Sequence, residues 1–182
     1  MFLYIILGLL VLLVLYVVAT YNGLIVLKKR VEESWSGIDV QLKRRANLIP
    51  NLVETVKGYA SHEKDVFEKV TQARAAVLSS TTPSEAATAN NMLSQALKSV
   101  FAVAEAYPEL KASANFGQLQ GDLSDTEDKI AYSRQFYNAN ALDFNTKVAV
   151  FPSVILASMF NFKPVDFFKA SDEDRQDVKV KF

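Results

Sequence analysis

The sequence predicts an all-α protein: an N-terminal transmembrane helix, then an antiparallel four-helix bundle, then a short C-terminal segment of helix and coil. Residues 1–20 form an uncharged apolar run, which predicts the transmembrane helix. Later segments repeat apolar residues at steps of three, four or seven, the spacing of one helix face. No stretch alternates apolar and polar residues for long enough to predict a strand.

The apolar run MFLYIILGLLVLLVLYVVAT belongs to a transmembrane helix expected over residues 1–22, which would lie in the lipid bilayer. About 20 residues at a rise of about 1.5 Å span about 30 Å, the thickness of the hydrocarbon core. A buried core helix and a cleaved signal peptide are the alternatives, and Val17 and Ala19 fit a small-residue cleavage site. Against the signal peptide, no Lys or Arg precedes the run, which exceeds the usual apolar core of about 7–15 residues.

The nearest basic side chains predict the orientation of this helix. Lys28, Lys29 and Arg30 follow the run, and the positive-inside rule places such a cluster in the cytoplasm. We therefore expect a single-pass protein of the cell (inner) membrane, with its N-terminus outside and its bundle domain in the cytoplasm.

Charge and cysteine content exclude several function classes. The chain carries 20 basic and 20 acidic side chains, whereas nucleic-acid binders have a basic excess, so no nucleic-acid partner is expected. Because the chain has no Cys, disulfides, Cys-ligated zinc and thiol catalysis are excluded, as is a lipid anchor on Cys.

Proline and capping residues predict the helix boundaries of the bundle domain, residues 23–150. Pro50 lacks a backbone donor and disfavours a helical conformation at Ile49, so the first helix should end or kink there. Thr82 and Glu85 form a capping box with Pro83 at the first helical position, which starts the third helix. The expected helices are about residues 21–48, 50–79, 83–107 and 114–150.

The fourth helix carries the clearest apolar seam, with residues spaced by seven. A seam of this length is typical of a helix packed in a bundle. Its members are Phe116, Leu123, Ile130, Tyr137, Phe144 and Phe151.

The segment of residues 151–169 is rich in aromatic side chains and too short to span a bilayer. It is expected either to fold back onto the bundle or to contact the membrane interface or a protein partner, since exposed aromatic patches mark such sites. Residues 170–182 have the composition of a flexible tail. The candidate contact residues are Phe151, Phe160, Phe162, Phe167 and Phe168.

No catalytic, cofactor-binding or metal-binding residue is predicted, and no small-molecule substrate is expected. His62 is the only histidine, and the sequence has neither a phosphate-binding Gly-rich loop nor a G-x-S-x-G or H-E-x-x-H motif. Lys43, Arg44 and Arg45 are interpreted as salt-bridged surface, with a partner's acidic patch as the alternative. An acidic cluster is interpreted as a solvated helix face, with a weak divalent-ion site as the alternative: Asp122, Asp125, Glu127 and Asp128.

Several polar residues on or near the apolar faces are interpreted as structural, because unsatisfied buried polar groups cost about 1–3 kcal/mol. The alternative is a binding surface for an unidentified partner. These residues are Trp35, Asn51, Tyr132, Arg134, Tyr137 and Asn138.

Several long blocks resemble the LemA family. They are residues 31–60 (VEESWSGIDVQLKRRANLIPNLVETVKGYA), residues 130–145 (IAYSRQFYNANALDFN), Phe151-Pro152-Ser153, Phe162-Lys163-Pro164 and Phe167-Phe168, with Tyr21-Asn22 after the apolar helix. The resemblance implies a bacterial membrane protein with one N-terminal span, a small outside N-terminus and a four-helix domain, and it implies no established enzymatic activity. Gly117 and Gly121 depart from the family pattern, which more often has better helix formers there.

Together these features predict a non-catalytic docking or assembly module at the bacterial inner membrane, whose partner is an unidentified protein or another copy of the chain. The alternatives are a membrane-shaping homo-oligomeric assembly and an accessory subunit of a membrane enzyme. An enzyme would have a concave pocket with convergent polar groups inside the bundle, whereas a wholly aliphatic and Phe core would exclude it.

Overall fold

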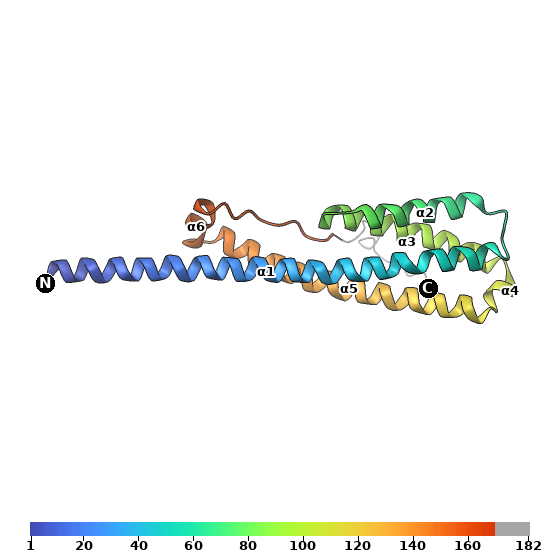
Figure 1. Ribbon diagram of the computed structural model, residues 1–182, viewed down its shortest axis with the longest axis horizontal. Helices are drawn as coiled ribbons and strands as arrows, with labels where there is room; N and C mark the ends of the chain where they lie inside the picture. The colour runs from blue at the N-terminus through green and yellow to red at the C-terminus, as the bar shows by residue number, and fades with distance from the viewer. Residues whose placement is uncertain (170–182) are drawn as a thin grey trace, which may run out of the picture. The chain divides into compact units, whose positions relative to one another are not determined.

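The computed structural model describes residues 1–169, so the predicted tail at residues 170–182 lies outside the described residues. This part of the chain contains six helices and no strand, which confirms the all-α prediction (Figure 1). The helices are α1 (Phe2–Lys57), α2 (Lys64–Ser79), α3 (Pro83–Glu105), α4 (Pro108–Lys111), α5 (Ala114–Ala149) and α6 (Ser153–Met159).

The chain divides into two compact units, and α1 and α5 contribute to both. The anchor unit comprises Met1–Ser36 and Gln135–Asp166. The bundle unit comprises Gly37–Arg134 and the described residues from Phe167 onward.

In the bundle unit, α1 continues through Pro50 to Lys57, so the prediction that the first helix ends at this proline is wrong. The chain turns instead at residues 58–63, before α2 begins at Lys64. A proline inside a helix leaves the carbonyl four residues earlier without its amide donor. Here that carbonyl belongs to Ala46, and the Nε of Arg74 on α2 donates a 2.9 Å hydrogen bond to it. A side chain from the next helix thus replaces the missing donor.

The capping box predicted for α3 is confirmed. The Glu85 amide donates to Thr82 Oγ1 at 3.2 Å, and the Thr82 amide donates to Glu85 Oε2 at 3.2 Å. Helix α3 ends at Glu105, and the short helix α4 precedes α5.

The seam of α5 is confirmed for all but its last residue. Phe116, Leu123 and Ile130 are buried in the bundle unit, and Tyr137 and Phe144 are buried in the anchor unit. Phe151 is 79% exposed, because α5 ends at Ala149 and the seven-residue register stops with the helix.

Among the described residues, α1 is the only helix long and apolar enough to span a membrane, and its apolar part lies in the anchor unit. None of residues 1–19 is buried, whereas Thr20 and Leu24 are. Helix α6 and the residues after it pack beside α1 from this point on, and the N-terminal end of α1 extends beyond them (Figure 1).

Candidate functional site

An aromatic cluster in the anchor unit lies where the apolar run of α1 ends. The Tyr21 ring packs edge to face against Phe160, with centroids 4.8 Å apart, and against Phe162 at 5.9 Å. Phe162 also packs against Phe144 of α5 at 6.4 Å. The aromatic cluster, Tyr21, Phe144, Phe160 and Phe162, therefore joins α1, α5 and the end of α6.

The end of α6 turns Phe162 back toward this cluster. Asn161 has a φ of 57°, the left-handed conformation that ends many helices and that Asn tolerates better than most residues. The amide of Phe162 donates to the Ala157 carbonyl at 2.8 Å, and the amide of Asn161 donates to the Ser158 carbonyl at 3.2 Å. This pair of bonds is the Schellman motif. These local backbone hydrogen bonds therefore set the direction of the chain at Phe162.

Side chains of α5 form hydrogen bonds with the backbone of the residues after Phe162. Asn145 Nδ2 donates to the Val165 carbonyl at 2.9 Å, and the Val165 amide donates to Asn145 Oδ1 at 2.8 Å. The Tyr137 hydroxyl donates to the Asp166 carbonyl at 2.7 Å. Burial, and then the charge of the Asp166 carboxylate, raise the pKa of Tyr137, so its phenol stays a donor.

The five predicted contact residues have different environments. Phe151 is 79% exposed, Phe160 is 45% exposed and Phe167 is 39% exposed. Phe162 is half-buried in the aromatic cluster, and Phe168 is buried in the bundle unit. Their contact with a membrane or a partner stays a prediction.

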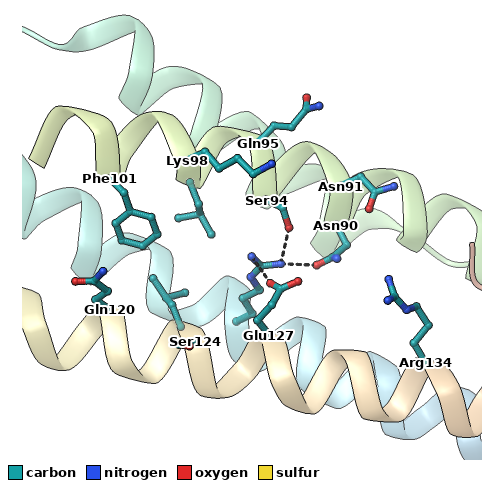
Figure 2. A pocket seen from close by; sticks show the side chains of 13 residues that line it. Asn90, Asn91, Ser94, Gln95, Lys98, Phe101, Gln120, Ser124, Glu127 and Arg134 are labelled. Carbon is teal, nitrogen blue, oxygen red and sulfur yellow. Dashed lines mark hydrogen bonds and ion pairs between the residues drawn. The ribbon is translucent and has the colours of Figure 1, made fainter. Parts of the chain in front are cut away.

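A second candidate site is a pocket of about 410 Å³ in the bundle unit, lined by both polar and apolar side chains of α1, α3 and α5 (Figure 2). Arg45 of α1 lies at its base and is only 5% exposed. Its Nη1 donates to Asn90 Oδ1 at 2.7 Å and to Ser94 Oγ at 3.1 Å, and its Nη2 pairs with Glu127 Oε2 at 2.6 Å. These contacts from α3 and α5 fix the guanidinium group in one orientation.

The electrostatics of this pocket favour anions. Burial lowers the pKa of Arg45 and the Glu127 carboxylate opposes this, but an arginine remains charged in any case. Among the described residues, the buried Nε of Arg45 has no hydrogen-bond partner. Lys98 and Arg134 also line the pocket, and Arg134 extends from α5 toward α3 (Figure 2). Three basic side chains and one acidic side chain thus face one hollow.

A family model described as the LemA family matches residues 34–182. The chain belongs to the LemA family. It is 29% identical to Protein LemA of Metamycoplasma hominis, over 83% of this chain and 69% of that protein. It is 24% identical to Magnetosome protein MamQ of Magnetospirillum gryphiswaldense and 25% identical to MamQ 2 of Paramagnetospirillum magneticum, over 81% and 82% of this chain. The chain spans less than two thirds of these two MamQ proteins, 64% of each.

The match to the LemA family covers the pocket around Arg45 and the aromatic cluster except Tyr21, and the whole apolar run of α1 precedes it. The predicted resemblance to the LemA family is thereby confirmed over residues 34–182.

In this LemA-family chain, the interpretation of the basic triplet as surface is wrong for Arg45. Lys43 and Arg44 are exposed, and Lys43 pairs with Asp39 at 2.6 Å. Arg45 is buried because it lies seven residues after Ile38 and four before Ile49, on the apolar face of α1. The spacing of Arg45 from Ile38 and Ile49 alone predicts this burial, whereas the composition of the triplet does not.

The members of the predicted acidic cluster also have different environments. Glu127 pairs with Arg45, while Asp125 and Asp128 are exposed on α5. His62 is also exposed. Within residues 1–169, no group of three or more His, Cys, Asp or Glu side chains is placed to hold a metal ion. The predicted lack of catalytic, cofactor-binding and metal-binding residues stays a prediction.

Proposed function

We propose that this LemA-family protein is a membrane-anchored docking module at the bacterial inner membrane. Residues 1–22 would span the bilayer, and the pocket around Arg45 would bind an acidic segment of a protein partner. The observation that carries this proposal is the buried Arg45, held in one orientation and accompanied by Lys98 and Arg134.

Binding is favoured over catalysis by the chemistry of these groups. An arginine keeps its proton at physiological pH, so it does not act as a general base, whereas its planar fork suits carboxylates and phosphates. A charge held at low dielectric acts more strongly on an anion than one in water. Arg45 supplies that field, while the half-buried Arg134 offers donors nearer to the surface of the pocket, and Lys98 adds positive charge to its lining.

The proposed topology places the N-terminus outside and the bundle in the cytoplasm. Lys28, Lys29 and Arg30 support it, because all three are exposed just beyond the apolar run. A reporter fused at Phe182 tests it: we expect a green fluorescent fusion to be active and an alkaline phosphatase fusion to be inactive. The reverse pattern would place the bundle outside the cell.

Photo-crosslinking tests the docking site. A photoreactive phenylalanine at Asn91, which lines the pocket, should crosslink a protein in cells, and one at the exposed Lys69 of α2 should not. The charge reversal Arg134→Glu should reduce the Asn91 crosslink about tenfold, since like charges repel an acidic segment. A crosslink that survives the reversal unchanged would contradict acidic docking. The mass of the product distinguishes a second copy of the chain from another protein.

The same pocket supports a second candidate, an accessory subunit that binds a small anion. Its volume of about 410 Å³ lies in the range of small-ligand sites, about 300–1,000 Å³. Thermal unfolding of the full chain in detergent, with and without millimolar inorganic phosphate or citrate, separates the candidates. Stabilisation that is lost in Arg134→Glu favours the small anion.

A further inference from the structure

Helix α6 and the two residues before it present an uncharged, apolar surface in the anchor unit. One side of α6 is buried through Ser153, Leu156 and Ala157. No charged residue occurs between Lys147 and Lys163, and both lysines are exposed. The α6 surface is defined by its exposed apolar side chains: Phe151, Val154, Ile155, Met159 and Phe160.

This surface is held at one level along α1. The contacts of Tyr21 with Phe160 and Phe162 fix the end of α6 beside the first residue after the apolar run. Helix α6 has only seven residues and is about 10 Å long, so all of its exposed side chains lie near that level. On α1, the residues before Thr20 are not buried.

We infer that the α6 surface is a second membrane contact, lying in the interface of the same bilayer that α1 spans. This inference rests on the proposed anchoring by residues 1–22. If those residues cross the hydrocarbon core, Tyr21 lies at its boundary, where aromatic rings are favoured, and the α6 surface lies there too.

Lipid is the occupant that the surface fits best. A helix that lies in the interface buries its apolar face at the boundary between the headgroups and the acyl chains. Lys147 and Lys163 bracket the segment, and their long side chains can reach lipid phosphates while their stems stay apolar. A protein partner would have to displace lipid from side chains already placed at the membrane boundary.

Single-cysteine labelling tests the inference, because the chain has no Cys of its own. The full chain is reconstituted into phosphatidylethanolamine and phosphatidylglycerol vesicles, and a fluorophore is attached to Ile155→Cys or Met159→Cys. Both side chains are exposed, at 53% and 71%, so neither substitution removes a core contact. Quenching is measured with nitroxides near the lipid headgroup, near the end of the acyl chain and in water.

Two matched sites serve as references. The first is Phe136→Cys, at a position on α5 where the native side chain is 55% exposed. It lies next to Tyr137, whose ring centroid is 6.2 Å from that of Trp35. Trp35 lies fourteen residues beyond Tyr21 on α1, about 21 Å further along the helix, so this site should be in water. Leu10→Cys, in the middle of the apolar run, reports the anchor itself.

We expect headgroup nitroxides to quench Ile155→Cys and Met159→Cys at least about twice as strongly as Phe136→Cys, and deep nitroxides to quench Leu10→Cys. Quenching at Ile155 and Met159 equal to that at Phe136, with Leu10 still quenched, would overturn the α6 contact and leave the anchor in place. Loss of lipid quenching at Leu10 as well would refute the anchor. Shielding of Ile155 and Met159 from both lipid and water nitroxides would also overturn the inference, since a protein would then cover the surface.

Discussion

The Nε of Arg74 donates a 2.9 Å hydrogen bond to the carbonyl oxygen of Ala46, the acceptor that Pro50 leaves without a helical amide. The bond links α2 to α1 at the turn where Pro50 removes a helical hydrogen bond. It explains how one helix passes through a residue that normally ends or kinks helices.

The first prediction concerns this bond. Arg74→Met should lower the free energy of unfolding by about 1–2 kcal/mol, because the Ala46 carbonyl loses the side-chain donor that replaces the missing amide. In the Pro50→Ala background the helical amide returns, and the same substitution should cost about half as much or less. Thermal unfolding of the full chain in detergent, followed by circular dichroism, measures both costs. Equal costs in the two backgrounds would show that the bond does not compensate for the proline.

The second prediction concerns the asymmetry of the Arg45–Glu127 ion pair. Glu127→Gln leaves a charged guanidinium buried without its counter-ion and should cost about 2 kcal/mol. Arg45→Met removes the charge but leaves the buried Oδ1 of Asn90 without its donor, so it is combined with Asn90→Leu. The half-exposed Glu127 then stays in contact with water, so this double variant should cost about 1 kcal/mol or less. Chemical denaturation of Glu127→Gln and of the double variant provides the comparison. A larger loss in the double variant than in Glu127→Gln would contradict this order.

The third prediction concerns the end of α6. Asn161→Gly should keep the stability of the protein, since Gly adopts a φ of 57° without steric cost. Asn161→Val should cost about 1–2 kcal/mol, because a β-branched side chain is strained in the left-handed region. Hydrogen exchange at Phe162, whose amide closes the Schellman motif, should accelerate only in the Val variant. Equal exchange in the two variants would argue against the motif.

The fourth prediction concerns the pH dependence of the α3 capping box. Hydrogen bonds from Thr81, and then from Thr82, lower the pKa of Glu85 below its ordinary value of 4.5. A lowered pKa in the folded state means that the contribution to stability is present above pH 4.5 and is lost as the pH falls through the folded-state pKa. The midpoint temperature of the native chain should therefore exceed that of Glu85→Gln at pH 6, and the gap should close as the pH falls toward 3. A gap that widens on acidification would reverse the sign and refute the capping role.

The fifth prediction concerns Asn145, which binds both backbone groups of Val165. Asn145→Ala should remove two hydrogen bonds at a cost of about 2 kcal/mol and accelerate hydrogen exchange at Val165. Asn140→Ala is the matched control, because Asn140 Nδ2 donates to the Phe136 carbonyl of its own helix. Val165 exchange that rises equally in both variants would show that Asn145 does not hold the segment.

Local patterns in the sequence determined the helical class, the apolar first turns of α1, the α3 cap and most of the α5 seam. Each depends on residues within a few turns of one another, so spacing and capping chemistry suffice to predict them. The assignment to the LemA family depended instead on the similarity of long sequence blocks to that family.

Only the tertiary structure decided where α1 ends, that Arg45 is buried, and which aromatic side chains meet. Arg74 donates to the Ala46 carbonyl from another helix. Glu127, which pairs with Arg45, lies 82 positions later in the chain. Tyr21 contacts Phe160 only because α6 folds back onto α1. A local pattern carries no record of such a donor, counter-ion or ring, because burial and hydrogen bonding depend on which distant groups the fold brings into contact.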